Sequence, residues 1–178
     1  DHLINRRLEI NVEDDILGWE QWALKNNVNP SIIAFAVGNP QVVFPEKLPE
    51  KQGPFCTPRS LVNVGHVLDA MAGNLGGNDA KHNLPTDTDA VEVAAAGIGG
   101  PAAAALFATL RLEAELPDIN TIIAAPGQAK VPSKPDAQML VCYKLASITD
   151  ERNITPIVKY IQRLPADFSR SEERRVGK

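Results

Sequence analysis

Residues 57–71 read Thr-Pro-Arg-Ser-Leu-Val-Asn-Val-Gly-His-Val-Leu-Asp-Ala-Met, and this stretch carries the marks of an amphipathic helix. Thr57 offers a capping hydroxyl, and Pro58 suits the first helical position because its missing N–H would be unpaired there anyway. Leu61, Val64 and Leu68 follow at helical spacing and form one apolar side. The stretch therefore predicts a helix that starts at Pro58 and runs to the neighbourhood of Met71.

Helical patterning returns in other segments on either side of this stretch, namely residues 12–26, 31–37, 102–115, 136–147 and 153–164. Proline, glycine and polar residues dominate the segments between them. This composition predicts loops at 39–56, 73–90 and 117–136, the last with a short turn at Ile119–Ile123. The predicted fold class is therefore mainly α, a small helical bundle.

Two of the helical segments show clear apolar faces. The first is predicted to have acidic residues in its first turn, where the helix dipole favours them, and an apolar face of Ile16, Leu17, Trp19, Trp22 and Ala23. The acidic residues of that turn are Glu13, Asp14 and Asp15. The last segment carries a stripe at i, i+3, i+4 and i+7, formed by Ile154, Ile157, Val158 and Ile161.

The ends of the chain differ from this helical middle. Residues 3–10 alternate weakly like one strand, and since a lone strand is unstable we expect them to be the edge of an α/β core that lies upstream. Residues 170–178 read Arg-Ser-Glu-Glu-Arg-Arg-Val-Gly-Lys and resemble translated sequencing-adapter read-through. The expected division is a core edge at 1–12, a helical domain at 13–116, a helical extension at 117–168 and a non-native or disordered tail at 169–178.

Composition and charge argue against several classes of protein. The chain has 178 residues, 44% of them hydrophobic and 22% charged, which is typical of a globular protein. Its formal charge is −4, or −6 without the last nine residues, which argues against a nucleic-acid partner. No apolar run approaches the length of about 18 residues that spans a bilayer, so we expect no membrane segment. The two cysteines form no disulfide framework, which favours a cytoplasmic location.

Arg59 is the strongest candidate for a binding residue. It falls in the first turn of its predicted helix, where a cation opposes the helix dipole and where free N–H groups attract anions. This placement suggests a phosphate partner, although a solvated arginine that pairs with a nearby carboxylate explains it too. Arg6 and Arg7 end the predicted strand, and at least one of them must lie at an exposed rim or interface.

The other reactive side chains suggest no site. His2, His66 and His82 and the two cysteines, Cys56 and Cys142, show no zinc-ligand spacing, and a lone cysteine is more often a small core residue. The segment Gly97-Ile98-Gly99-Gly100 lacks the Gly-Lys-Ser/Thr ending of a phosphate loop, and it is interpreted as the lead-in to a helix.

The order of several short motifs resembles the C-terminal part of a AAA+ ATPase of the MoxR type, over residues 3 to 168. The motifs are Leu3-Ile4-Asn5-Arg6, Trp19-Glu20-Gln21-Trp22-Ala23, Asn29-Pro30, Ala34-Phe35, Cys56-Thr57-Pro58-Arg59-Ser60, Gly97-Ile98-Gly99-Gly100, Leu116-Pro117-Asp118, Val131-Pro132 and Arg163-Leu164-Pro165-Ala166-Asp167-Phe168. The resemblance implies that the helical bundle is the lid domain of such an ATPase. It also implies that Arg6 is an arginine finger reaching a neighbouring subunit's nucleotide, with Arg7 in place of a frequent aromatic residue. Arg59 would be the sensor-2 residue that contacts the γ-phosphate of its own subunit.

The resemblance further implies ATP and Mg²⁺ as ligands of the full-length parent, a hexameric ring, a chaperone or remodelling role and a partner with a von Willebrand A domain. The 178 residues hold no Walker A or Walker B motif, so the fragment alone is expected to bind neither ligand and to be inactive. The alternative is a stand-alone helical protein-interaction module without catalysis.

Overall fold

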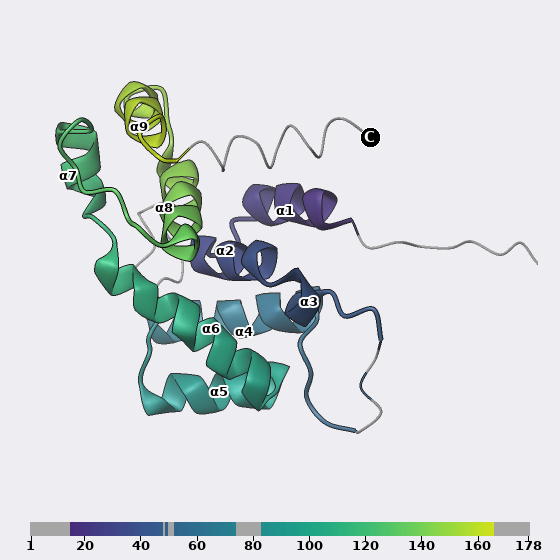
Figure 1. Cartoon of the computed structure of the whole chain (residues 1–178). Coiled ribbons are helices and arrows are strands. Elements are labelled where there is room, and N and C mark those ends of the chain that lie inside the picture. Colours follow the sequence, from purple (N-terminus) through teal and green to yellow (C-terminus); the bar gives the residue numbers. More distant parts are fainter. Residues whose placement is uncertain (1–14, 48, 50–51, 74–82, 166–178) are drawn as a thin grey trace, which may run out of the picture.

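The computed structural model describes residues 15–47, 49, 52–73 and 83–165, and within these ranges the protein is a bundle of helices (Figure 1). The predicted strand at 3–10 and the tail at 170–178 lie outside the described residues. The mainly helical fold class is confirmed. The elements are α1 (Ile16–Lys25), α2 (Pro30–Gly38), α3 (Pro40–Val43), α4 (Pro58–Met71), α5 (Thr88–Ile98), α6 (Gly100–Arg111), the 3₁₀ helix η2 (Leu112–Glu115), α7 (Ile119–Ala124), α8 (Pro135–Ile148) and α9 (Ile154–Ile161).

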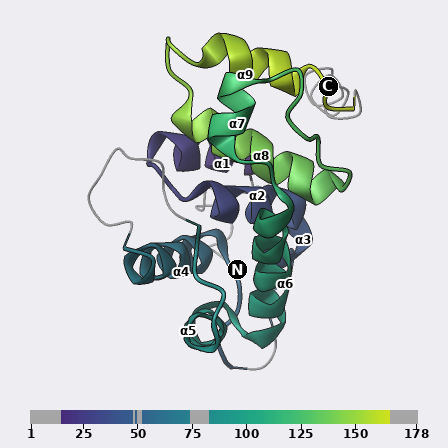
Figure 2. The ribbon, with the colours of Figure 1, turned by 90° about the vertical axis from the view of Figure 1, so that its left-hand side faces the viewer.

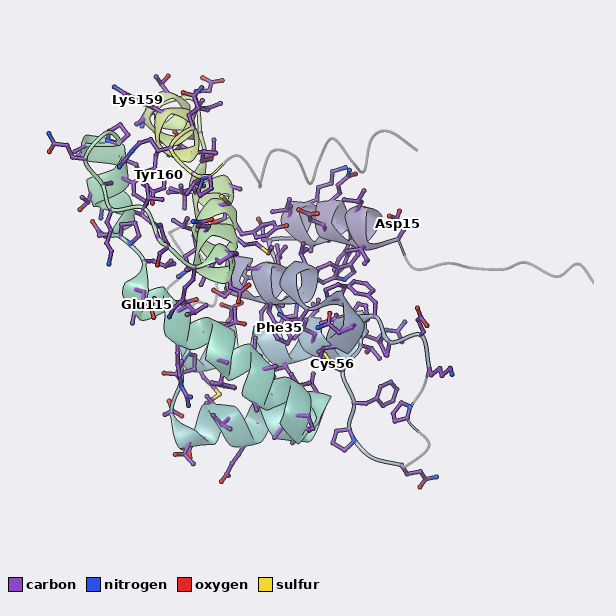
Figure 3. The ribbon with its side chains drawn as sticks, in the orientation of Figure 1. Asp15, Phe35, Cys56, Glu115, Lys159 and Tyr160 are labelled. Atoms are coloured by element: carbon purple, nitrogen blue, oxygen red, sulfur yellow. The ribbon has the colours of Figure 1, made fainter. Side chains whose placement is uncertain are left out.

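Helix α2 lies at the centre of the bundle. The Asn29 side chain caps it and Pro30 opens it, and the residues from Pro30 to Ala36 are all buried. A helix that is apolar all round is stable only when other elements cover every side. Helices α1, α3, α4, α6 and α8 supply that cover, and Phe35 lies inside the packed region between α2 and its neighbours (Figure 3).

A second, smaller apolar cluster joins α7, α8 and α9. Its buried residues include Ile122 of α7, Val141 and Leu145 of α8, and Ile157 and Tyr160 of α9. These three helices lie together above α2 in Figure 2, while α4, α5 and α6 lie below it. The helices packed around α2 form one part of the bundle, and α7, α8 and α9 form the other. Helix α8 contacts α2 as well, so it belongs to the packing of both parts.

A buried polar network links the two parts. The Ser31 hydroxyl donates to the Glu113 carboxylate, and the Lys144 ammonium pairs with the other oxygen of that carboxylate at 3.1 Å. Lys144 also donates to the side chain of Asn83. Because buried charges are costly unless they are paired, this network fixes how α2, η2 and α8 meet.

Two helices, α3 and α5, were not predicted, and they correct the sequence-based expectation. Helix α3 lies within 39–56, and α5 begins at Thr88, inside the loop predicted at 73–90. The Asp87 carboxylate caps α5 by accepting from the Ala90 N–H at 3.0 Å. The residues that α5 buries include two alanines, Ala90 and Ala94, whose small side chains give a weak amphipathic signal.

The glycines of residues 97–100 have a packing role. Gly99 has a φ of +83°, and a Cβ there would lie 2.6 Å from the carbonyl oxygen of Pro54. A Cβ on Gly97 would lie 2.4 Å from Val64 Cγ2. These glycines therefore allow the sharp α5–α6 turn and the close approach of α5 to α4, consistent with a lead-in to a helix.

The two predicted apolar faces are only partly buried. On α1, Leu17 and Trp22 are exposed while Ala23 is buried, and Asp15 is the cap of α1, where the expectation had placed it in the first turn. Glu13 and Asp14 lie outside the described residues. On α9, Ile157 is buried but the other three residues of the stripe are exposed: Ile154, Val158 and Ile161. In the described part of the chain, no helix has the length and apolar character to cross a lipid bilayer.

Candidate functional site: a pocket between α1 and α4

A pocket of about 470 Å³ lies between α1 and α4. Helix α4 contributes Arg59, Val62, Asn63 and His66, which lie at i, i+3, i+4 and i+7 and so share one side of the helix. Pro58 also lines the pocket, and α1 contributes Trp19 and Trp22. Its volume lies within the range of small-molecule sites, and its lining combines two aromatic rings with a few polar side chains.

The start of α4 is built as the sequence predicts, and it holds Arg59 at the pocket. The Thr57 hydroxyl oxygen accepts from the Ser60 N–H at 3.1 Å, and the Thr57 N–H donates to Ser60 Oγ at 2.9 Å. This reciprocal capping box fixes the first turn. Pro58 has no N–H, so the first backbone N–H of α4 belongs to Arg59, which also lines the pocket.

The guanidinium of Arg59 is exposed, and no carboxylate of the described residues forms an ion pair with it. A cation in the first turn of a helix is unfavourable by roughly 0.3–1 kcal/mol when nothing compensates it. An anion held by the guanidinium would remove that cost and would also benefit from the helix dipole. The site therefore suits a phosphate or carboxylate group.

The two tryptophans form the other wall and differ in how they are packed. The ring of Trp19 packs edge-on against Phe44, with centroids 5.7 Å apart and an interplanar angle of 82°. Trp22 lines the same pocket and is 45% exposed. The Tyr143 hydroxyl donates to the Glu20 carboxylate, which ties α1 to α8 and fixes this wall. Exposed aromatic faces beside a cation favour a planar ligand that carries negative charge.

The remaining predicted residues lie elsewhere. Arg6, Arg7, His2 and His82 fall outside the described residues, so the structure does not place the predicted finger relative to Arg59. Among the described residues, no group of three or more histidine, cysteine or acidic side chains is arranged to hold a metal ion.

The cysteines fit the core interpretation. Cys56 is buried in the larger cluster, and desolvation raises the pKa of its thiol to about 11. Burial also raises the pKa of Cys142. The thiolate is the nucleophilic form, so neither thiol is activated at neutral pH.

Comparison of the chain with protein-family models, curated proteins and solved structures finds no match in any of the three. The site is therefore assessed by its own geometry.

Sequence reasoning found Arg59 but missed the rest of the pocket. The signal was present, because Val62, Asn63 and His66 share a side of α4 with Arg59, away from the apolar side predicted by Leu61 and its neighbours. The sequence did not indicate which helix would face that side. The tryptophans were predicted on an apolar face of the first helix, and only the packing of α1 in the bundle brings them to the pocket.

Proposed function

We propose that the chain is the lid and arginine-finger portion of an ATP-hydrolysing AAA+ ATPase of the MoxR type. The observation that carries the proposal is the placement of Arg59. It is exposed in the first turn of α4, forms no ion pair among the described residues and lines a pocket with two tryptophans. An exposed guanidinium without a carboxylate partner can form bidentate, charge-assisted hydrogen bonds with a phosphate group, which supports this role.

ATP and Mg²⁺ would be ligands of the full-length parent. The pocket fits part of that ligand pair, since Arg59 suits a phosphate and the tryptophan rings suit a planar group. Mg²⁺ prefers oxygen ligands and substrate phosphates, and the pocket offers no carboxylate among its lining residues. Its protein ligands and the Walker motifs would lie upstream, so this fragment is proposed to be inactive alone.

In this proposal the two arginines act at different nucleotides. Arg59 stabilises the γ-phosphate held by its own subunit, and Arg6 reaches the nucleotide of a neighbour in a hexameric ring. Both neutralise charge that develops on the transferred phosphoryl group, and arginine fingers of this kind contribute about 10³–10⁵ in rate. Lid movement would couple the nucleotide state to a cytoplasmic remodelling or chaperone role, beside a partner with a von Willebrand A domain.

The test compares arginine variants in the full-length parent. Arg59→Ala is expected to lower kcat for ATP hydrolysis by about tenfold to a hundredfold, because it removes a charge-assisted contact. Arg152→Ala is the matched control, since Arg152 is an exposed arginine that does not line the pocket, and the kcat of this variant should not change. Equal turnover in the wild type and Arg59→Ala would contradict the assignment.

Arg6 has a different signature because it acts on another subunit. Arg6→Ala is expected to lower turnover by about 10³. Mixing it with subunits that have an intact finger and a dead Walker B motif should restore part of the activity, whereas Arg59→Ala should not be restored in this way. Rescue of both variants, or of neither, would contradict the division of roles.

The second candidate is a stand-alone helical interaction module, and the exposed apolar residues of α9 favour it. DNA sequencing upstream of Asp1 separates the two. An in-frame Gly-x-x-x-x-Gly-Lys-Ser/Thr motif supports the ATPase, and a start codon directly before Asp1 supports the module.

A further inference from the structure

The residues of α1 that reach other helices lie in a definite order around its axis. Ala23 is completely buried, and α1 packs on α2. Relative to Ala23, Glu20 lies about 60° around the helix to one side. Trp19 and Trp22 lie about 40° and about 100° to the other side. Glu20 and the two tryptophans therefore flank the buried side of α1 in opposite directions.

A residue of α8 holds the Glu20 side. The Tyr143 hydroxyl donates to the Glu20 carboxylate in a partly buried hydrogen bond. Tyr143 packs against the larger apolar cluster, while its α8 neighbours Val141 and Leu145 belong to the smaller one. Because α8 packs in both parts of the bundle, its backbone gives the Tyr143 hydroxyl a fixed position.

The tryptophan side of α1 borders the pocket and has less packing to hold it. Trp22 is 45% exposed and Trp19 is half-buried, and both line the pocket together with Arg59. The ring of Trp19 has an edge contact with Phe44. A ring that borders a pocket has few partner atoms on that side, so packing there resists a rotation of α1 weakly. The bond at Glu20 is the contact best placed to oppose such a rotation.

We propose that Tyr143 is a positioning residue for the pocket. Its hydroxyl holds Glu20 and so sets the rotation of α1 that brings the two tryptophan rings to the pocket lined by Arg59. At a radius of about 5–6 Å, a rotation of about 10° displaces the side chains by about 1 Å, which is enough to impair a binding site. This positioning role deepens the proposed function and rests on it, because the wall concerned is the one that would hold the planar group of a nucleotide.

Tryptophan fluorescence measures the position of this wall in the 178-residue chain. Trp19 and Trp22 are the only tryptophans of the sequence, so the emission reports on the pocket alone. Arg59 attracts the anionic quencher iodide and leaves the neutral quencher acrylamide unaffected. The ratio of the iodide to the acrylamide quenching constant, at constant ionic strength, therefore reports how near the rings are to the guanidinium. Arg59→Ala should lower this ratio about twofold or more, and an unchanged ratio would overturn the proposed arrangement.

Variants of the hydrogen bond test its effect on the wall. Tyr143→Phe keeps the ring and removes the hydroxyl, and its ratio should fall toward that of Arg59→Ala because α1 turns. Glu20→Ala should have the same effect, whereas Glu20→Gln should keep the wild-type ratio because its amide oxygen still accepts from Tyr143. Tyr143→Phe/Glu20→Ala should have a ratio no lower than that of either single variant, since both changes remove the same bond.

The second tyrosine of the chain supplies the matched control. Tyr160 also donates its hydroxyl, to the carbonyl oxygen of Lys130, but it belongs to α9 and does not line the pocket. Tyr160→Phe should therefore keep the wild-type ratio. Circular dichroism should show the same helical signal in all variants, and Glu20→Ala tests the same bond if Tyr143→Phe loses that signal. The proposal is overturned if Tyr143→Phe keeps the wild-type ratio, if Tyr160→Phe lowers it equally, or if Glu20→Gln behaves like Glu20→Ala.

Kinetics of the full-length parent test the consequence for the nucleotide. Tyr143→Phe should raise KM for ATP about threefold to tenfold by displacing the aromatic wall, with kcat little changed because Arg59 remains. A fall in kcat as large as that of Arg59→Ala would overturn the positioning role. A lowered quenching ratio in Tyr143→Phe with unchanged turnover in Arg59→Ala would support the positioning role and contradict the ATPase assignment. An unchanged ratio with lowered turnover in Arg59→Ala would do the reverse.

Discussion

The helices packed around α2 and the helices α7 to α9 bury their apolar residues in different ways. In the first part, Ile32, Ile33 and Phe35 of α2 are completely buried because five other helices of the described chain contact α2. In the second part, α9 is covered on one side only, and Val158 is 46% exposed next to the buried Ile157. The comparison teaches that enclosed apolar side chains are the main support of the first part, while the half-covered α9 depends more on polar anchors.

Those anchors are hydrogen bonds to the loop between α7 and α8. The Tyr160 hydroxyl donates to the carbonyl oxygen of Lys130 at 2.8 Å, and the Arg163 guanidinium donates to that of Ala129 at 2.8 Å. The guanidinium carbon of Arg163 also lies 5.7 Å from the centre of the Tyr160 ring. Each bond satisfies a backbone oxygen that the loop cannot satisfy itself, so these contacts define where α9 sits.

The largest expected effect is a loss of stability in the part packed around α2. Phe35→Ala should lower the free energy of unfolding by about 3–5 kcal/mol, because it leaves a cavity in a helix enclosed on all sides. Ile157→Ala in α9 should cost less, about 2 kcal/mol, since its half-covered surroundings relax more easily. Urea denaturation measures both. Equal losses in the two variants would show that the two parts are not held differently.

The buried polar network of Ser31, Glu113 and Lys144 gives the next largest expected effect on the free energy of unfolding. Lys144→Met leaves the Glu113 carboxylate buried without its cation and should cost about 3 kcal/mol. Glu113→Gln/Lys144→Met should recover more than half of that loss, because the amide keeps the contact with Ser31 and carries no charge. Urea denaturation again provides the measurement.

An exposed ion pair supplies the control for this bridge. Lys134 and Glu115 form a pair at 2.7 Å with side chains 54% and 49% exposed. Lys134→Met should therefore change the free energy of unfolding by less than about 1 kcal/mol. A loss as large as that of Lys144→Met would mean that burial of the Glu113 pair adds nothing.

Local signals explain which elements were predictable from the sequence. Helices α2, α4 and α8 each begin with proline, and the Thr57 cap of α4 forms as predicted. Helix α5 was missed because alanines carry little hydrophobic contrast, although its Asp87 cap was a usable signal. Start and stop signals are encoded within a few residues, so they survive without tertiary information.

Burial depends on partners that local patterns do not specify. The α9 stripe correctly predicts an amphipathic helix, but which half of it is covered depends on how α7 and α8 reach it. The pocket has the same origin. Arg59 is recognisable from its place in the first turn, whereas the tryptophan wall exists only because α1 packs on α2 beside α4. Tertiary packing therefore decides the parts of the site that the sequence left open.

The smallest expected effect concerns the anchor of α9. Burial raises the pKa of Tyr160 above its ordinary value, with Arg163 opposing the rise, so the hydroxyl keeps its proton and donates to the Lys130 carbonyl. Tyr160→Phe removes that bond and should lower the stability of α9 by about 1 kcal/mol. Hydrogen exchange should then become faster in α7 and α9 while α2 is unchanged, because the two parts are stabilised by different contacts. Lys159→Ala, at the neighbouring exposed position, is the matched control and should leave exchange as in the wild type. Faster exchange in α2 as well would show that the α7–α9 part and the α2 part open together, and the distinction between them would fail.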